Sequence, residues 1–254
     1  MPRFVSWNVN GLRAVEKKGF ASVLERFSAD CFCVQETKAS PDQLSEDLRN
    51  INGYRSYFAS AEKKGYSGVA VWAKAEPEKV AAGMGSPEFD REGRVLTLSY
   101  PDFHLVNCYF PNAQPELARI DYKIAFNERL AGFVNELRKE KTVVVCGDFN
   151  VAHTPLDLAR PKQNEGSPGY SEQERAFMDR FLGDGWVDTF RMFQKEGGHY
   201  TWWSFRANAR EKNIGWRIDY FCVDEKSRRR VTEAAIHPEV TGSDHCPVSL
   251  ILAG

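Results

Sequence analysis

Acidic and amide side chains lie next to several short apolar runs in this sequence. Four such groups occupy residues 7–11, 34–38, 146–150 and 242–245, and another acidic residue, Asp219, stands at the start of an apolar run. Loops at strand ends are held by a rigid scaffold, and active sites gather there. The pattern predicts that these side chains meet at one site, although each of them alone is typical of a turn.

Together these side chains have the chemistry that hydrolysis of a phosphodiester requires. The candidates are Asn8, Glu36, Asp148, Asn150, Asp219, Asp244 and His245. The reaction needs a hard cation such as Mg²⁺, which takes oxygen ligands from carboxylates and from the substrate phosphate. It also needs a base for the attacking water and donors for the developing negative charge. Because Glu36 would be costly to bury without a partner, we expect a metal ion beside it.

Other kinds of catalytic site are not supported by the sequence. It contains no G-x-x-x-x-G-K-[ST] phosphate loop, no H-E-x-x-H zinc motif and no C-x-x-C pair. Five of the six cysteines lie inside apolar runs, where a reduced cysteine behaves as a small hydrophobic residue: Cys31, Cys33, Cys108, Cys146 and Cys222. The cysteines therefore favour a cytosolic protein over a secreted disulfide scaffold.

The composition is that of a folded protein. The 254 residues include 34 Lys and Arg against 35 Asp and Glu, so the net charge is 34 − 35 = −1, and 42% of the residues are hydrophobic. No apolar run approaches the roughly 18 residues that span a bilayer. The first residues lack the apolar core of a secretion signal. We expect a single cytoplasmic domain over residues 1–254, with no membrane partner.

One segment is more basic than the rest of the chain. Residues 199–230 contain eight Lys or Arg and four Asp or Glu, a local charge of +4, and also Trp202, Trp203 and Trp216. The local field at a site matters more than the net charge for a polyanionic partner. Basic side chains mixed with aromatic ones suit contact with phosphates and stacking on bases. A solvated loop with core aromatics is the alternative.

Short apolar runs bounded by turn residues predict strands over residues 4–9, 31–34, 69–72, 95–100, 105–109, 143–146, 218–223 and 248–252. The pair Pro101 and Asp102 marks a tight hairpin. Helices are predicted over residues 116–140, where apolar residues follow a 3.6-residue period, over residues 41–49, and from Ser171, where Ser171 and Glu174 form a capping box. Hairpins and helices together favour an α/β domain of two packed mixed sheets with helices outside.

Seven motifs resemble those of the exonuclease III family of apurinic/apyrimidinic (AP) endonucleases, which belongs to the wider DNase I-like endonuclease/exonuclease/phosphatase group. They are WNVNGLR (7–13), QETK (35–38), YSGVAV (66–71), YFPNA (109–113), GDFNVAH (147–153), NIGWRIDYF (213–221) and GSDHCP (242–247). The resemblance runs in order from about Phe4 to Leu252. Residues 147–162 and 213–219 are the part most specific to the DNA-repair branch.

The resemblance implies a four-layered αββα sandwich and a Mg²⁺-dependent enzyme, with Mn²⁺ as a substitute. Its expected reaction is incision of double-stranded DNA on the 5′ side of an abasic site, leaving a 3′-hydroxyl and a 5′-deoxyribose phosphate. The same family leads us to expect 3′-phosphodiesterase and 3′→5′ exonuclease activities on blocked 3′ ends. A monomer is expected, associated with the nucleoid if the source is prokaryotic.

By position in these motifs, the resemblance also assigns roles to residues. Glu36 looks like the main metal ligand, and the further metal-site candidates are Asn8, Asp148, Asn150, Asp244 and His245. Asp148 looks like the group that activates the attacking water or protonates the leaving oxygen, and Asn150 like the group that orients that water or the phosphate. His245 and Asp219 look like a couple on the scissile phosphate, which Tyr109 and Asn112 are also expected to contact.

For the DNA contacts, Trp216 and Ile218 match an apolar pocket for the flipped-out sugar, with either Trp202 or Phe205 as its third wall. Arg206 and Asn208 are expected to contact the DNA. The chain departs from some relatives at three places: Asn10 replaces Asp, residues 114–116 offer no Arg to enter the duplex, and Arg206 replaces Met. Groove penetration is therefore expected to rest on Arg206.

Two other functions are compatible with the same fold. One is a phosphatase for inositol phosphates or lipids, which the tryptophans in the basic segment disfavour. The other is a non-catalytic regulator that binds nucleic acid. Such a regulator is expected to have a broken catalytic set, whereas this chain keeps all the candidate residues.

Overall fold

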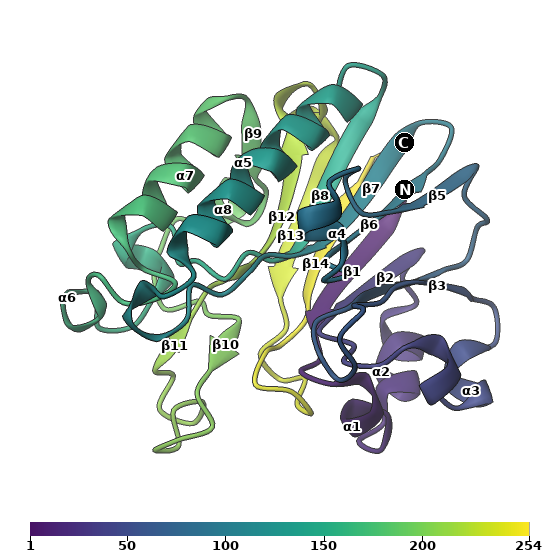
Figure 1. Cartoon of the computed structure of the whole chain (residues 1–254), viewed down its shortest axis with the longest axis horizontal. Helices are drawn as coiled ribbons and strands as arrows, with labels where there is room; N and C mark the ends of the chain where they lie inside the picture. Colours follow the sequence, from purple (N-terminus) through teal and green to yellow (C-terminus); the bar gives the residue numbers. More distant parts are fainter. Residues whose placement is uncertain (254) are drawn as a thin grey trace.

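Two six-stranded sheets form the centre of the computed structural model, which describes residues 1–253 (Figure 1). The first has the order β13-β14-β1-β2-β4-β3 and the second β5-β6-β7-β8-β12-β9. The first contains β1 (Arg3–Asn8), β2 (Cys31–Gln35), β3 (Arg55–Ala59), β4 (Val69–Ala73), β13 (Val231–Ile236) and β14 (Val248–Leu252). The second contains β5 (Lys79–Ala82), β6 (Val95–Ser99), β7 (Phe103–Tyr109), β8 (Thr142–Asp148), β9 (Trp186–Asp188) and β12 (Asp219–Asp224).

Both sheets are mixed. The pairs β1/β2 and β7/β8 are parallel, and the other pairs in the two sheets are antiparallel. A separate two-stranded ribbon of β10 (Trp202–Trp203) and β11 (Gly215–Trp216) lies at the end of the sheets opposite the two termini (Figure 1). The ribbon therefore extends the edge at which the parallel strands β1, β2, β7 and β8 end.

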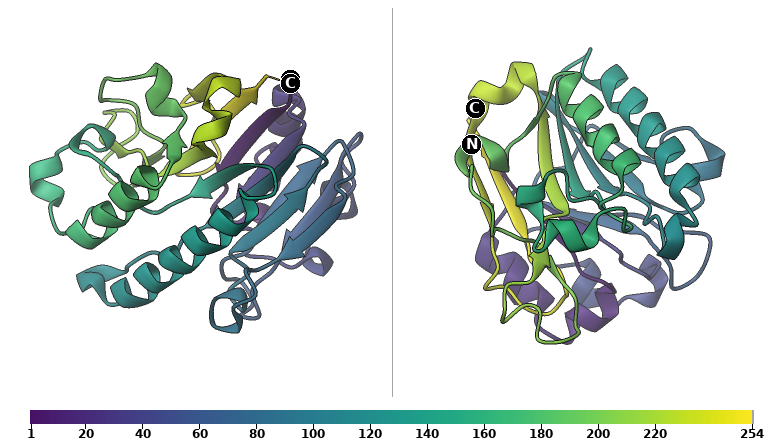
Figure 2. Two further views of the ribbon diagram at one scale, coloured as in Figure 1. Left: turned by 90° about the horizontal axis from the view of Figure 1, so that it is seen from above. Right: turned by 90° about the vertical axis from the view of Figure 1, so that its left-hand side faces the viewer.

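Helices cover the two outer faces. α5 (Ile120–Leu137) and α7 (Glu172–Gly183) pack on the second sheet, and α1 (Leu12–Glu16), α2 (Phe20–Phe27) and α3 (Glu46–Arg49) pack on the first (Figures 1 and 2). The remaining short helices are α4 (Pro87–Asp90), α6 (Pro161–Asn164) and α8 (Phe190–Phe193), with 3₁₀ turns at Pro41–Gln43, Pro115–Leu117, Pro155–Asp157 and Glu225–Arg230. The predicted four-layered αββα sandwich is confirmed.

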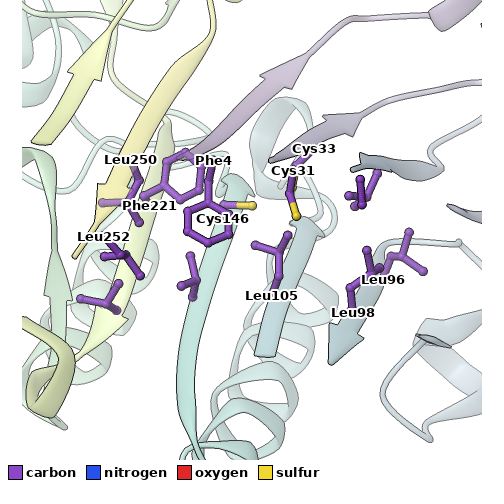
Figure 3. Packing of buried hydrophobic residues seen from close by; sticks show 14 of the residues in the cluster. Phe4, Cys31, Cys33, Leu96, Leu98, Leu105, Cys146, Phe221, Leu250 and Leu252 are labelled. Carbon is purple, nitrogen blue, oxygen red and sulfur yellow. The ribbon is translucent and has the colours of Figure 1, made fainter. Parts of the chain in front are cut away.

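The main core lies between the sheets. Figure 3 shows side chains from both sheets meeting there, among them Phe4 of β1 and Phe221 of β12, whose rings are 6.5 Å apart. Cys31, Cys33 and Cys146 are buried in the same layer as free thiols. Strands with one face on this core and the other under helices are buried on both sides, which explains why the sequence shows continuous apolar runs.

Two helix predictions were wrong at their boundaries. The helix predicted over residues 116–140 begins only at Ile120, because Glu116 has the left-handed φ of 58° inside a 3₁₀ turn. The helix predicted over residues 41–49 is broken in two, since the Ser45 side chain accepts the Leu48 N–H and starts α3 afresh. The capping box of Ser171 and Glu174 and the hairpin between β6 and β7 are confirmed.

Within the described residues, no helix combines the length and the apolar character that crossing a membrane requires.

A buried ion network holds the segment that leads into β12. The guanidinium of Arg217, only 1% exposed, contacts the carboxylates of Asp157 and Asp188, each with a shortest N–O distance of 2.7 Å. Burial alone would raise the pKa of Asp157, but Arg217 and Arg191 lower it to about 2. Asp157 is therefore ionised at neutral pH, and removing Arg217 would leave two buried carboxylates without their main counter-charge.

We predict that Arg217→Met lowers the free energy of unfolding by about 3–5 kcal/mol, the usual cost of breaking a buried ion pair. Urea denaturation at neutral pH measures this. Arg138→Met is the control, because the Asp184 partner of Arg138 is 56% exposed and such pairs contribute about 1 kcal/mol or less. Equal losses in the two variants would contradict the assignment of Arg217 as a structural centre.

Candidate active site

The candidate site forms where strand ends from both sheets meet. Parallel neighbours end at the same edge of a sheet, so Asn8, the last residue of β1, lies beside Gln35 at the end of β2. In the same way Tyr109 of β7 lies opposite Asp148 of β8, and Asp219 of the antiparallel β12 lies on the other side of Asp148. This topology brings together groups that are as much as 237 positions apart, from Asn8 to His245.

Local backbone conformations at this edge are unusual. Asn10, Glu36, Lys38 and Asn150 all have positive φ, between 48° and 53°. Such conformations are costly for residues with side chains and persist where the surrounding structure imposes them, often at functional sites. Hydrogen bonds fix the loop after β2, because Glu36 O accepts from Gly11 N and Lys38 N donates to Ser67 O.

Gly147 allows Asp148 to occupy its position. Gly147 has φ of 135°, and a Cβ built there would lie 1.8 Å from the carbonyl oxygen of Cys108 on the neighbouring strand. Only glycine permits this approach of β7 and β8. The sequence Gly147-Asp148, which is also typical of a turn, thus marks the point where β8 closely approaches β7.

Asp148 is a buried carboxylate with donors on several sides. Its Oδ2 accepts from Asn8 Nδ2 at 2.8 Å, and its Oδ1 accepts from the backbone N–H of Asn150 at 2.8 Å. Burial, followed by the negative charge of Asp219, raises the pKa of Asp148 to about 7. A carboxyl group with this pKa is suited to both accepting and donating a proton near neutral pH.

His245 is paired with a second carboxylate. Its Nδ1 lies 2.8 Å from Asp219 Oδ2, and its Nε2 lies 3.9 Å from Asp148 Oδ2. Burial would lower the pKa of His245, but the charge and hydrogen bond of Asp219 outweigh this and raise it to about 10. His245 is therefore an imidazolium at neutral pH. The hydroxyl of Thr201 also donates to Asp219 Oδ2, at 2.6 Å, and fixes that carboxylate.

Glu36 presents its carboxylate to the same cavity. Its Oε2 lies 2.7 Å from Lys38 Nζ, and its Oε1 accepts from Asn8 Nδ2 at 3.0 Å. Burial works against the ionised form, but Lys38 outweighs it and holds the pKa of Glu36 below its usual value. Glu36 is thus ionised across the physiological range.

The donor set fits a hard cation. One ligand atom from each of Glu36, Asp148 and His245 lies within 4.8 Å of the others. Two converging carboxylates supply the oxygen ligands that Mg²⁺ or Mn²⁺ takes. The raised pKa of Asp148 reports negative charge that a cation would compensate. His245, when protonated, is a donor to phosphate instead of a ligand.

Three further predicted metal ligands make hydrogen bonds to their neighbours in this structure. Asn8 accepts the Asn10 N–H with its oxygen and turns its NH₂ toward the carboxylates, so it is a donor. Asn150 likewise points its NH₂ at Asp148 and accepts from Asn112 at 3.1 Å. Asp244 lines the cavity but lies outside the three-residue cluster.

A cavity of about 210 Å³ joins these polar groups to an aromatic pocket. Its lining residues are Glu36, Tyr109, Asn112, Asp148, Asn150, Pro168, Gly169, Trp202, Trp216, Ile218, Asp244 and His245. Trp202 and Trp216 face each other across the β10/β11 ribbon with their rings edge to face. Gly169 closes one side, because a Cβ there would lie 3.2 Å from the Trp216 ring.

The structure decides which residue is the third wall of the aromatic pocket. Trp202 lines the cavity, whereas Phe205 does not line it and is 74% exposed in the loop after β10. Of the two candidates for the third wall, Trp202 is thus the one that lies in the cavity. Arg206 and Asn208 are exposed in the same loop and are not in the lining of the cavity.

The basic segment does not act as one surface. Arg206, Arg210 and Lys212 lie in the loop between β10 and β11, but residues 226–230 follow the far end of β12. Since β12 begins at Asp219, its six residues place the second group roughly 20 Å from the site at about 3.3 Å per residue. The summed charge of +4 over residues 199–230 is therefore divided between two ends of the sheet.

Some site residues had no place in the predicted set. Thr201 and Gly169 carried no signal other than their position beside Trp202 and Pro168. Lys38 and Asn10 stand inside two of the motifs, each two positions from a predicted ligand, and a cation next to Glu36 could have been inferred from that spacing.

Comparison with known proteins identifies relatives over nearly the whole chain. The family model described as "Endonuclease/Exonuclease/phosphatase family" matches residues 5–245. An exodeoxyribonuclease of Bacillus subtilis is 48% identical, over 98% of this chain and 99% of its own length. A DNA-(apurinic or apyrimidinic site) endonuclease of Dictyostelium discoideum is 40% identical, over 98% of this chain and 70% of its own.

Solved structures agree with these relatives. An AP endonuclease from Archaeoglobus fulgidus superimposes with a TM-score of 0.88 at 26% identity, covering 99% of both chains. An AP endonuclease from Leishmania major gives a TM-score of 0.89 at 30% identity, covering 100% of this chain and 88% of the other. The resemblance that the motifs indicated is confirmed: this chain belongs to the endonuclease/exonuclease/phosphatase family.

Proposed function

We propose that this protein is a DNA-repair nuclease of the exonuclease III type that requires Mg²⁺, for which Mn²⁺ can substitute. It hydrolyses the phosphodiester bond on the 5′ side of abasic sites in double-stranded DNA and leaves a 3′-hydroxyl and a 5′-deoxyribose phosphate. It also removes blocking groups from 3′ ends and acts as a 3′→5′ exonuclease. It works as a monomer in the compartment that holds the DNA, the cytoplasm and its nucleoid in a prokaryote.

One observation carries this proposal: hydrolytic groups and a tight aromatic pocket share a single cavity. Glu36, Asp148 and His245 lie at one side of it, and Trp202 and Trp216 at the other. A sugar that has lost its base can enter the cavity against an apolar wall formed by the two indole rings, while its 5′ phosphate reaches the polar side. Extrusion is easiest where base pairing is already absent, which adds selectivity without reading any base.

Asp148 acts as the general base in this proposal. With a pKa raised to about 7 by burial and by its carboxylate neighbours, it can take a proton from the attacking water and return it to the leaving oxygen. The NH₂ groups of Asn8 and Asn150, at 2.8 and 3.3 Å from Asp148 Oδ2, hold that carboxylate in place. The neighbouring amide of Asn112 and the side chain of Tyr109 line the path of the phosphate.

His245 stabilises the developing charge. Because Asp219 keeps it protonated, its Nε2–H is available to a non-bridging phosphate oxygen, and no reorganisation is needed when negative charge grows there. Glu36 would be the main ligand of the cation. When bound, that cation supplies Lewis-acid polarisation of the phosphate.

The exposed loop between β10 and β11 makes the backbone contacts to DNA. Arg206 and Asn208 are exposed in this loop, which joins the two strands that carry Trp202 and Trp216. Residues 114–116 carry no Arg, so Arg206 is the main side chain for entering the groove.

Incision of a duplex with one tetrahydrofuran abasic analogue tests the proposal. With Mg²⁺ we expect a single cut on the 5′ side of the analogue, and no cut with chelator. Cleavage of inositol phosphates in place of abasic DNA would favour the phosphatase reading. DNA binding without any cut would favour the regulator.

Glu36→Gln is predicted to raise the Mg²⁺ concentration for half-maximal incision at least about tenfold, the lower end of what even outer-shell changes cost a metal site. The change removes the charge at nearly constant volume, so the thermal midpoint in chelator should stay close to that of the wild type. An unchanged Mg²⁺ dependence would show that Glu36 is not a ligand.

Asp148→Asn should reduce the single-turnover incision rate most strongly, because it abolishes proton transfer while keeping the side chain's shape. General acid–base catalysis contributes about 10²–10⁴-fold. The affinity for abasic DNA in chelator should fall little or rise, since a negative charge near the phosphate is lost. A loss of incision rate below about tenfold would assign the base role to another group.

Trp216→Ala is predicted to weaken the preference for abasic over intact duplex, because it removes one wall of the sugar pocket. The matched control is Trp186→Ala, which truncates a buried tryptophan stacked on Phe181 away from the site. The control should lose about 3–5 kcal/mol of stability and keep the preference.

Arg206→Ala should weaken binding to both duplexes and reduce the salt slope by about one.

The pocket assignment fails if Trp216→Ala loses stability as the control does but keeps its full preference for abasic DNA. Competition binding with fluorescent duplexes gives the preference, and urea denaturation of the same samples gives the stability.

A further inference from the structure

One tryptophan of the sugar pocket makes a polar contact on the side of the metal site. The indole N–H of Trp202 donates to Asp244 Oδ2 at 3.0 Å. The neighbouring Trp203 points the other way, and its N–H donates to Asn213 Oδ1 at 3.2 Å beside a different cavity. Only the first of these two tryptophans therefore connects the pocket wall to the acidic cluster.

From Asp244 a continuous set of side-chain contacts reaches Glu36. Asp244 Oδ1 accepts from Asn10 Nδ2 at 3.0 Å, and Asn10 Oδ1 accepts from Lys38 Nζ. Lys38 Nζ in turn lies 2.7 Å from Glu36 Oε2. Trp202, Asp244, Asn10, Lys38 and Glu36 form one chain, which we name the Trp202–Glu36 relay.

The direction of every bond in the relay is fixed by chemistry. An indole N–H and an ammonium group can only donate, and ionised carboxylates can only accept. Asn10 stands between an acceptor and a donor, and its amide satisfies both in one orientation only. A flipped amide would place NH₂ against the ammonium of Lys38 and oxygen against the carboxylate of Asp244.

The relay accounts for asparagine at position 10. An aspartate there would put a second carboxylate against Asp244, at the 3.0 Å spacing that Asn10 Nδ2 now has. Like charges at such a distance raise each other's energy strongly away from bulk water. The amide, unlike the Asp of some relatives, donates to one of these neighbours and accepts from the other.

We propose that Trp202 is a positioning residue that couples occupancy of the sugar pocket to cation binding at Glu36. A sugar packed on the indole restricts the ring, which holds Asp244 and, through it, the amide of Asn10 that accepts from Lys38. A cation that displaces the Lys38 ammonium from Glu36 then leaves that ammonium on a fixed acceptor, so the two ligands favour each other. This inference rests on the proposed function, because it takes an abasic sugar as the occupant.

Coupling of this kind is reciprocal, so it can be read from DNA affinity alone. The probe is a fluorescein-labelled duplex with one tetrahydrofuran site, titrated by anisotropy in chelator and in saturating CaCl₂ at equal ionic strength. Gels of the same samples check that the duplex stays intact. The coupling factor is the dissociation constant in chelator divided by that in Ca²⁺, corrected by the same ratio for an intact duplex.

For the wild type we expect a coupling factor of about five or more, the lower end of measured couplings between sites. Trp202→Phe keeps an aromatic wall but loses the N–H, and its factor should fall close to one. Trp203→Phe loses an indole N–H on the other side of the ribbon and should keep the wild-type factor. Asn10→Asp should behave as Trp202→Phe does, because it breaks the relay from its middle.

The outcomes separate this inference from the function on which it rests. If the wild type cuts abasic DNA with Mg²⁺ but Trp202→Phe retains the full coupling factor, the relay does not couple the sites and the function stands. A coupling factor of one in a wild-type enzyme that cuts abasic DNA would also show that the relay does not couple the two sites. If the wild type neither cuts nor prefers abasic DNA, the proposed function and the coupling are overturned together.

Discussion

Three carboxylates converge around one imidazolium at the edge where the two sheets meet. Asp148 and Asp219 flank His245 on its two nitrogens, and a carboxylate oxygen of Glu36 lies within 4.8 Å of both Asp148 and His245. Buried like charges repel strongly, so each group depends on a specific compensation. The positive charge of His245 compensates both aspartates, and that of Lys38 compensates Glu36. The amide of Asn8 donates hydrogen bonds to both Glu36 and Asp148. Burial, followed by the negative charge of Asp219, still raises the pKa of Asp148, so this carboxylate is not fully compensated.

The fold can be understood as the means of holding this cluster. Parallel pairs in both sheets end at one edge, and the antiparallel β12 starts there, so five strands deliver side chains to one place. The contact between β7 and β8 depends on Gly147, and the loops beyond the strands depend on residues in left-handed conformations. These local costs are offset by the large core between the sheets, where the strands are buried on both faces.

Much of the site was predictable from sequence, because a change from apolar to polar residues marks the end of a strand. The apolar runs located β1, β2, β8 and β14 to within two residues, and the polar groups that follow the first three and precede β14 form the site. Periodicity could not find strands such as β3 or β13, which are partly exposed and carry charged residues. It also missed the ribbon of β10 and β11, whose two-residue strands have no period to detect.

Side-chain direction was the harder part. Trp202 and not Phe205 forms the pocket wall because Trp202 lies opposite Trp216 in the ribbon, a register that only the structure gives. Asn8 donates where an oxygen ligand was predicted, because the backbone N–H of Asn10 already takes its oxygen. The summed charge of residues 199–230 wrongly suggested one basic surface, because β12 separates Arg206 from residues 226–230.

The protonation of His245 is the most direct test of this account. Nitrogen-15 NMR of the imidazole, recorded in chelator from pH 5 to pH 10, reports which ring nitrogens carry protons. Because Asp219 raises the folded-state pKa to about 10, above the ordinary 6.5, His245 should remain doubly protonated at pH 8 and lose its proton only as the pH approaches 10. Asp219→Asn should move the titration to lower pH. A neutral His245 at pH 7 in the wild type would contradict the account.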